Sequence, residues 1–175
     1  MLRKKDTTIK YMFHCVNDIP PEIVRELGLE AILFDLDNTT VKDATLTTVP
    51  GAIAWVKCLK EAGIKVAIVT NTPHIRAFWF ARAFGVRFHA FAKKPLSLGL
   101  IRMSRKLKVP LGKIGMVGDQ VFTDVAAANR CGAVPLLVDP VENKWFWKNH
   151  YKKNRLKEKP IREKFLEEHG YYGDK

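Results

Sequence analysis

The stretch Ala31-Ile-Leu-Phe-Asp35-Leu-Asp37-Asn-Thr39 decides the fold of this chain. Its four leading apolar residues are typical of a short strand buried on both faces of a parallel sheet. Two carboxylates follow immediately, at the point where the strand must end. In parallel α/β sheets ligands bind beyond the carboxyl ends of the strands, so this stretch predicts both a sheet and the position of its site.

Outward from this stretch, short apolar runs alternate with segments of helical periodicity. Prolines and glycines mark the boundaries, because proline favours the first turn of a helix and glycine the position just past its end. The alternation predicts an α/β fold, a doubly wound, Rossmann-like parallel sheet with helices on both faces. The expected strands are 31–35, 64–69, 86–90, 114–117 and 134–138, and the expected helices are 20–28, 50–63, 75–84, 97–107 and 124–130.

The composition bounds the function without fixing it. Of 175 residues, 47% are hydrophobic, which is enough for one compact core. The 30 Lys and Arg against 18 Asp and Glu give a net charge of +12, which favours anionic partners. Cys15, Cys58 and Cys131 are odd in number and far apart, which argues against a disulfide framework or a structural zinc site. No secretory signal or transmembrane segment stands out, so we expect a cytoplasmic protein, or one peripheral on a membrane surface.

Polar residues follow several of the expected strands, and the sheet should bring them to one rim. They are three or more carboxylates, a hydroxyl and an ammonium, with no His or Cys among them. Hard oxygen ligands of this kind favour magnesium. The residues are Asp35, Asp37, Thr70, Lys94, Asp119 and Asp124.

A bound cation would let a carboxylate act as nucleophile toward a phosphoryl group that it would otherwise repel. Asp35 is suited to that attack, and Asp37 could protonate the leaving oxygen and then activate water. Thr70 and Lys94 could stabilise the transferring oxygens. The chemistry indicated is magnesium-dependent hydrolysis of a phosphomonoester through an aspartyl-phosphate.

These segments together resemble the four motifs of the haloacid dehalogenase-like (HAD) superfamily. They are Asp35-Leu-Asp37-Asn-Thr39, Thr70-Asn71, Lys94-Pro95 and Gly118-Asp119-x4-Asp124, in the family's order within residues 30–140. The strings LFDLDNT, AKKP and VGDQVFTDV further resemble the YqeG-type phosphatases of HAD subclass III, a group linked to phosphatidylglycerophosphate phosphatases. Thr40 departs from that group, which usually carries an apolar residue there.

The resemblance implies a role for each matching residue. Asp35 would be the nucleophile and Asp37 the general acid and base, while Thr70, Asn71 and Lys94 would bind phosphate. The implied magnesium ligands are Asp35, the carbonyl of Asp37 and Asp119, with Asp124 and Thr39 in support.

Two positions stay open between a role in the site and a structural role. Lys93 competes with Lys94 for the phosphate, and Pro95 favours Lys94 because it follows the lysine in the family pattern. Asp124 could be a helix cap, which is the usual role of an aspartate at that position, a site residue, or both.

The chain divides at about residue 140. Residues 1–140 should form the HAD-like core, with a short helical lead-in at 1–29, and residues 141–175 a basic, aromatic, partly helical tail. A docking helix is expected after Pro160. Trp145, Phe146, Trp147 and Tyr151 lie among Lys and Arg in this tail, a mixture that suits edge packing, a membrane surface or, less well, nucleic acid.

The intervals between the motifs leave no room for an inserted cap domain, since one helix and a short strand use up each of them. An open site can accept a phosphate carried on something large, and phosphatidylglycerophosphate at an anionic membrane is the leading substrate. The alternatives are a phosphatase of a soluble metabolite or nucleotide, and an RNA- or ribosome-associated protein with an idle hydrolase site. A signalling receiver domain also gathers acids, a threonine and a lysine, but Asp37 argues against a long-lived phosphoaspartate. The sequence does not indicate an oligomeric state.

Overall fold

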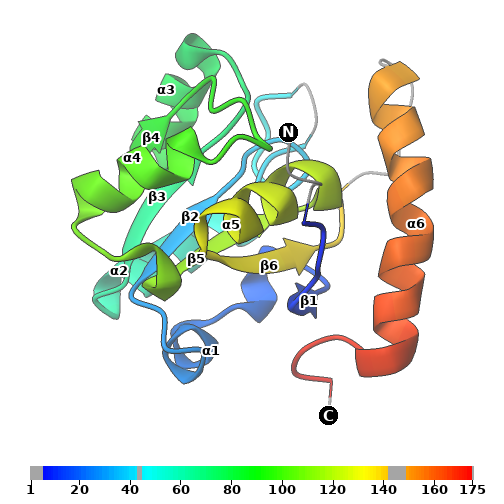
Figure 1. Ribbon diagram of the computed structural model, residues 1–175. Helices are drawn as coiled ribbons and strands as arrows, with labels where there is room; N and C mark the ends of the chain where they lie inside the picture. The colour runs from blue at the N-terminus through cyan, green and yellow to red at the C-terminus, as the bar shows by residue number, and fades with distance from the viewer. Residues whose placement is uncertain (1–5, 43–44, 142–148, 175) are drawn as a thin grey trace.

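The computed structural model describes residues 6–42, 45–141 and 149–174, and within them it forms one six-stranded sheet (Figure 1). The order is β1-β6-β5-β2-β3-β4, and every neighbouring pair is parallel. The expected α/β fold with a parallel sheet is confirmed. The strands are β1 (Tyr11–Phe13), β2 (Ala31–Phe34), β3 (Lys65–Val69), β4 (Arg87–His89), β5 (Ile114–Gly118) and β6 (Val134–Val138).

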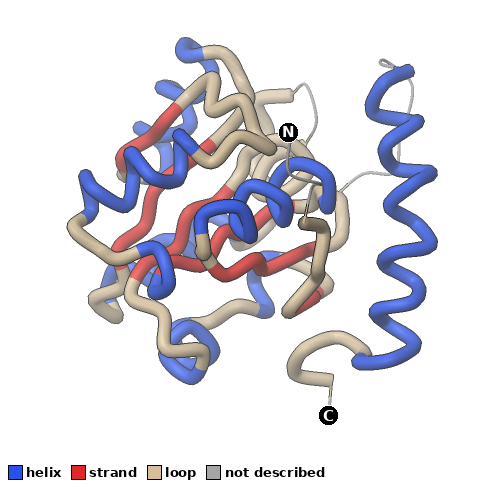
Figure 2. Tube along the Cα trace, in the orientation of Figure 1, coloured by secondary structure: helices blue, strands red, loops and turns tan. Residues whose placement is uncertain are grey.

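Helices cover both faces of the sheet (Figure 2). The apolar sides of α2 and α3 join one core cluster, and those of α4 and α5 join the cluster on the opposite face. A single helix connects β2 to β3, and another connects β3 to β4, so no cap domain is inserted in the described chain. The helices are α1 (Pro21–Glu26), α2 (Ala52–Glu61), α3 (His74–Phe84), α4 (Leu98–Leu107), α5 (Ala126–Cys131) and α6 (Asn149–His169).

The chain reverses its direction across the sheet between β2 and β5. From β2 it steps outward to β3 and β4, and then crosses back to β5 and β6 on the other side of β2. In the register, Phe34 lies beside both Ile68 of β3 and Val117 of β5. The residues that follow β2, β3 and β5 therefore emerge side by side at the switch point, where open α/β sheets bind their ligands.

Two elements of the core differ from the sequence-based expectation, as does the helix α6 described below. The lead-in contains the strand β1, which pairs with β6 at the edge of the sheet. The sequence did not predict this strand, because the run Tyr11–Phe13 is too short to show the alternation of a strand. The helix expected from Asp124 begins instead as a π-turn, Val121–Val125, before α5.

The helix α6 runs beside the β1 edge of the sheet (Figure 1). It begins before Pro160 and continues through it, whereas a helix was expected only after that proline. Contacts on both sides of the proline hold the helix: the carboxylate of Glu158 accepts the Phe122 N–H at 3.1 Å, and Phe165 packs on the cluster around Met12. Trp145, Phe146 and Trp147 lie outside the described residues. No helix in the described parts of the chain is long and apolar enough to cross a membrane.

Candidate active site

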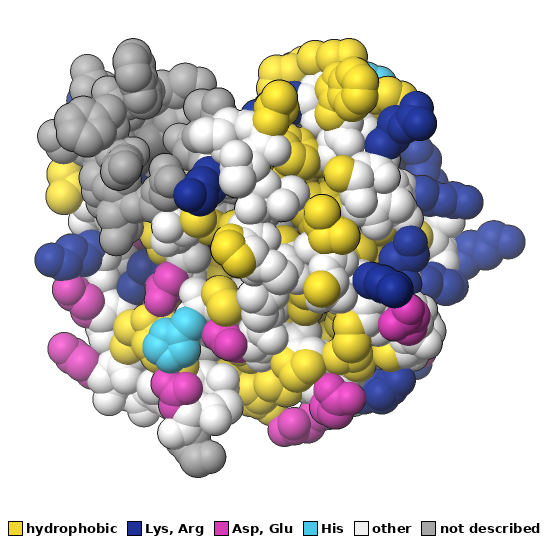
Figure 3. Space-filling view, turned by 180° about the vertical axis from the view of Figure 1, so that it is seen from behind, with side chains coloured by type: hydrophobic (Ala, Val, Ile, Leu, Met, Phe, Trp, Pro, Cys, Tyr) yellow, Lys and Arg dark blue, Asp and Glu magenta, His cyan; other side chains and the backbone are white. Residues whose placement is uncertain are grey.

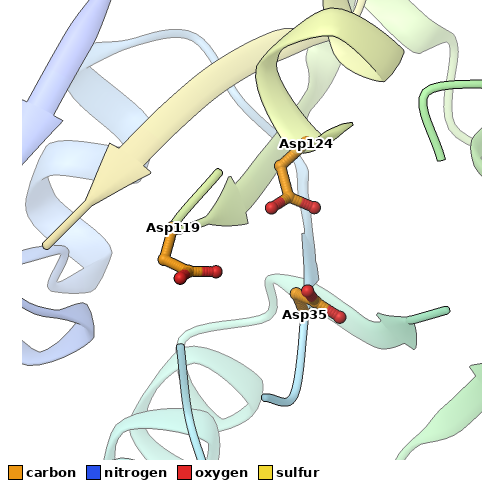
Figure 4. Close-up of side chains that lie close together, drawn as sticks. All are labelled: Asp35, Asp119 and Asp124. Carbon is orange, nitrogen blue, oxygen red and sulfur yellow. The ribbon is translucent and has the colours of Figure 1, made fainter. Parts of the chain in front are cut away.

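Three buried carboxylates point toward one another at the switch point (Figure 4). Asp35 follows β2, Asp119 follows β5, and Asp124 lies on the π-turn. One oxygen of each carboxylate lies within 4.8 Å of the others, and the residues are 6%, 0% and 1% exposed. Ionised carboxylates this close repel one another, so the cluster needs a positive charge.

Gly118 permits this close approach. A Cβ atom at Gly118 would lie 2.2 Å from the carboxylate carbon of Asp124, a distance that no real contact allows. The glycine before Asp119 is therefore required for Asp124 to reach the cluster.

Lys94 supplies one buried positive charge. Its ammonium lies 3.0 Å from Asp35 Oδ1 and 2.6 Å from Asp124 Oδ1, and donates to the Val69 carbonyl at 2.9 Å. Burial alone would lower the pKa of Lys94, but the carboxylates of Asp124 and Asp35 reverse this, so the pKa is raised. Lys93 is exposed instead, which leaves the site to Lys94.

Asn71 places Lys94 through the backbone. Its side-chain oxygen accepts the Lys94 N–H at 2.8 Å, and its side-chain nitrogen donates to the Lys94 carbonyl at 3.2 Å. This pair of hydrogen bonds ties the segment after β3 to the segment after β4. Asn71 is thus placed to position the lysine.

Asp124 has both of the roles that the sequence left open. Its Oδ2 accepts the Gln120 N–H at 3.2 Å, which caps the π-turn, while its Oδ1 faces Lys94. Burial raises the pKa of Asp124, Lys94 opposes the rise and the nearby Asp35 adds to it, which together leave the pKa at about 6. The pKa of Asp124 therefore depends on the charges of the side chains beside it.

The cluster fits a small divalent cation. Asp35 Oδ1 and Asp124 Oδ1 are buried and accept no hydrogen bond of acceptable geometry within the described chain, although both face the Lys94 ammonium. Among the hydrogen bonds of the described residues, Asp119 Oδ1 accepts one, a long bond of 3.2 Å from the Thr39 hydroxyl. The atoms of the cluster that could bind a metal ion are all oxygens, which are the ligands that Mg²⁺ prefers.

The carboxylate of Asp37 turns away from this cluster. It accepts hydrogen bonds from the Thr72 hydroxyl at 2.5 Å and from the Arg76 guanidinium at 2.6 Å. Thr70 lies next in this chain of contacts, since its hydroxyl bonds that of Thr72 at 3.1 Å. Asp37 is therefore held at the mouth of the site, 31% exposed, by the start of α3.

A tight loop after β2 sets these two aspartates apart. The N–H groups of Thr39, Thr40 and Val41 all donate to the Leu36 carbonyl. Asn38 adopts a φ of 58°, a conformation that asparagine tolerates better than most residues. The buried Thr40 hydroxyl donates to the Asp35 carbonyl at 2.9 Å, so the threonine that departs from the subgroup supports the main chain of the site.

The helix α6 also reaches the site. The guanidinium of Arg155 pairs with the Asp119 carboxylate and donates to the Asp119 carbonyl at 2.6 Å, and Arg162 bonds the same carbonyl. Buried Glu158 accepts from Arg155 at 3.3 Å. The Arg155 side chain is only 12% exposed, so this arginine of the basic tail is turned toward the site.

Sequence reasoning did not identify Thr72, Arg76, Arg155 or Arg162 as neighbours of the site. Thr72 and Arg76 lie just after the Thr70-Asn71 segment, and their position at a helix start beyond a strand was an available signal. No sequence signal pointed to Arg155 or Arg162, because their contacts with Asp119 span 36 and 43 residues of sequence.

The fold and the cluster place this chain among Rossmann-like α/β proteins with an acidic site at the switch point. Residues 40–132 match the haloacid dehalogenase-like hydrolase family model. The chain is 36% identical over 144 residues to the probable phosphatase YqeG of Bacillus subtilis, covering 81% of each. It belongs to the haloacid dehalogenase-like hydrolases.

More distant relatives agree with this assignment. The chain is 24% identical over 127 residues to a chloroplastic phosphatidylglycerophosphate phosphatase 1 of Chlamydomonas reinhardtii, of which it spans 47%. An uncharacterized protein of Listeria monocytogenes superposes with a TM-score of 0.56 at 16% identity, over 68% of this chain and 85% of that one. The cobalt-bound deoxy-D-mannose-octulosonate 8-phosphate phosphatase of Haemophilus influenzae gives 0.53, at 16% identity, over 73% and 75%. At these identities the two structures bear on the fold alone.

Proposed function

We propose that this hydrolase is a magnesium-dependent phosphomonoester phosphatase that acts through an aspartyl-phosphate on Asp35. The observation that carries the proposal is the buried cluster of Asp35, Asp119 and Asp124. Lys94 lies against two of these carboxylates, and Asp37 lies at the mouth. A nucleophile, countercharges and a separate acid are then present at one edge of the sheet.

The reaction has two steps, phosphorylation of Asp35 and hydrolysis of the phosphoaspartate. An oxygen of Asp35 forms a bond to phosphorus while the bond from phosphorus to the substrate's alcohol oxygen breaks, and Asp37 gives that oxygen a proton. Asp37 then takes a proton from a water molecule that attacks the phosphorus, the bond to Asp35 breaks, and inorganic phosphate leaves. Proton transfer by a positioned group contributes about 10²–10⁴-fold.

Lys94 and Thr70 stabilise the charge that spreads over the phosphoryl oxygens. Lys94 is held by Asn71 and by the Val69 carbonyl, so its ammonium needs little reorganisation. Magnesium, held by Asp35, Asp119 and the Asp37 carbonyl beside Asp124, supplies positive charge that offsets the repulsion between Asp35 and the phosphate.

The substrate that fits best is a phosphate on a large or lipid carrier, with phosphatidylglycerophosphate as the leading candidate. The absence of a cap in the described chain supports this, since an open site does not enclose a small metabolite. The printed name of the Chlamydomonas relative and the net charge of +12 also support it. Such a substrate would place the protein on the cytoplasmic side of an anionic membrane, bound peripherally.

The test is a screen of soluble and lipid phosphomonoesters with magnesium present and then chelated, on wild type and on Asp35→Asn. We expect hydrolysis that depends on magnesium and falls by at least about 10³-fold in Asp35→Asn, because the nucleophile is lost. Asp18→Asn, which changes an exposed aspartate remote from the cluster, serves as the matched control. Turnover like that of wild type in a folded Asp35→Asn protein would refute the mechanism, and a phosphoaspartate that persists for hours would indicate a receiver domain.

A further inference from the structure

The large hydrophobic side chains that are exposed gather at the edge of the sheet that carries the site. In the described chain, eight of nine come from loops after strands or from the first two turns of α2, α3 and α4. Those segments lie at the carboxyl edge of a parallel sheet. The eight are Leu46, Ile53, Ile75, Phe78, Trp79, Phe91, Leu96 and Leu98, and the ninth is Leu156 on α6.

Seven of them lie on the segments around the mouth of the site, and we call these seven the apolar rim: Leu46, Ile75, Phe78, Trp79, Phe91, Leu96 and Leu98. On α3, Ile75 and Trp79 are one helical turn apart and are 66% and 61% exposed. The Phe91 N–H donates to the Thr72 carbonyl at 3.2 Å, which joins the loop after β4 to the start of α3. Arg76 bonds the Thr45 carbonyl and so ties the loop of Leu46 to the same helix.

Cations lie beside the apolar rim, with the partly exposed carboxylate of Asp37 at the mouth. Residues 62–118, which include α3, the loop after β4 and α4, contain eleven Lys and Arg and no Asp or Glu. Some of these cations, such as Lys65 at the start of β3 and Arg87 at the start of β4, lie at the opposite edge of the sheet. Exposed Lys93 lies between Phe91 and Leu96, and the Arg82 guanidinium lies 5.9 Å from the centre of the Phe78 ring. Figure 3 shows hydrophobic side chains at the top of the molecule, with Lys and Arg along the adjoining side.

We propose that the apolar rim seats the protein on an anionic lipid bilayer, with the mouth of the site facing the headgroups. Apolar side chains flanked by cations match the interfacial layer of such a bilayer, where the former enter the acyl boundary and the latter meet anionic headgroups. The orientation brings Asp35 to a headgroup phosphate without a transmembrane segment. This inference deepens the proposed function, on which its choice of a lipid phosphate rests.

The observations favour a bilayer over two other occupants. A second copy of the chain would bring Arg82 and Lys93 of one molecule against the same charges of the other, which is unfavourable. Single-stranded nucleic acid binds by stacking on aromatic rings, and most of the apolar rim is aliphatic. The surface also lies on α3 and the loop after β4, away from α6, where Arg155 is paired with Asp119 (Figure 1).

The experiment is co-sedimentation of the full chain with vesicles of phosphatidylglycerol and phosphatidylcholine, and with phosphatidylcholine alone. These vesicles contain no phosphomonoester, so binding is measured apart from catalysis. We expect wild type to bind the anionic vesicles, and the double substitution Ile75→Ser with Trp79→Ser to weaken partition by about tenfold or more. Turnover of a small soluble phosphomonoester should change less than about twofold, since neither residue touches the cluster.

Leu156→Ser is the matched control, because Leu156 is 60% exposed but lies on α6. A second pair, Phe91→Ser with Leu98→Ser, repeats the test if the α3 variant unfolds. Failure of wild type to bind, equal loss in Leu156→Ser, tighter binding to RNA, or a dimer that the α3 variant dissociates would each overturn the proposal. Failure of the phosphatase screen with vesicle binding intact would instead overturn the proposed function alone.

Discussion

The surroundings of Asp37 differ from those of Asp35, although both residues follow β2. The Asp37 carboxylate is held by Arg76 and Thr72, while Asp35 faces Lys94, so two acids separated by one residue have different surroundings. The pair of donors fixes the direction in which Asp37 points. We therefore treat Arg76 as a positioning residue, which acts on the reaction through Asp37.

Replacement of Arg76 should expose this role. We expect Arg76→Gln to lower kcat by about tenfold to a hundredfold with a smaller change in KM, because Asp37 loses the donor that orients it. The loss should be greater for a poor alkyl leaving group than for a nitrophenyl ester, which leaves without much help from an acid. Steady-state kinetics on both esters measure the loss of kcat, and Arg130→Gln, at an exposed arginine, is the control. Equal losses of kcat on both esters would count against a role of Arg76 through Asp37.

The residues of the acidic cluster and Lys94 were predictable from sequence, and the residues that support them were not. Asp35, Asp119, Asp124 and Lys94 could be found because each follows a recognisable strand. Thr40 appeared only as a departure from the subgroup, since nothing in a sequence shows that its hydroxyl meets the Asp35 carbonyl. Local patterns indicate where the chain turns, but they carry no information on which side chains meet after the sheet has assembled.

The same contrast holds for whole elements. The strands β2, β3, β5 and β6 have clear apolar runs and were expected, and the short β4 was expected within 86–90. The strand β1 was not expected, and it depends on the edge of β6 for its hydrogen bonds. The helix α6 has scattered apolar residues, and it is fixed by tertiary contacts through Glu158, Arg162 and Phe165. The sequence predicted a partly helical tail with a docking helix only after Pro160, because the partners of the earlier part of α6 come from distant segments.

The contact of α6 with Asp119 predicts competition with a metal ion. Because the Arg155 guanidinium pairs with the carboxylate that magnesium needs, Arg155→Met should lower the apparent Kd for magnesium by about tenfold. Isothermal titration of the two proteins measures this without reference to turnover. Lys159→Met is the control, since Lys159 is exposed on the same helix and pairs only with Glu163 at 3.6 Å among the ion pairs described. An unchanged or weaker affinity in Arg155→Met would show that the arginine does not compete.

At the scale of the whole molecule, the acidic cluster is a point of electrostatic repulsion within the fold. The Lys94 ammonium pairs with two of its three carboxylates, Asp35 and Asp124. The third, Asp119, pairs with the Arg155 guanidinium. Burial raises the pKa of Asp124 to about 6 against the opposing charge of Lys94. The cluster also joins the halves of the sheet, since Asp35 follows β2 and Asp119 follows β5. An ion bound there should therefore stabilise the entire domain against unfolding.

Magnesium should raise the melting temperature of the protein. An ion present at about 100 times its Kd adds about 2.7 kcal/mol to the free energy of unfolding if it binds only the folded state. For a chain of 175 residues, each kcal/mol corresponds to about 2–4 °C, so we expect a shift of roughly 5–10 °C. Calorimetric scans of wild type and Asp119→Asn, with magnesium and with a chelator, make the comparison. The shift should disappear in Asp119→Asn, because that variant lacks a carboxylate that only the folded state brings to the cluster; a shift retained there would mean that the ion stabilises the fold from another site.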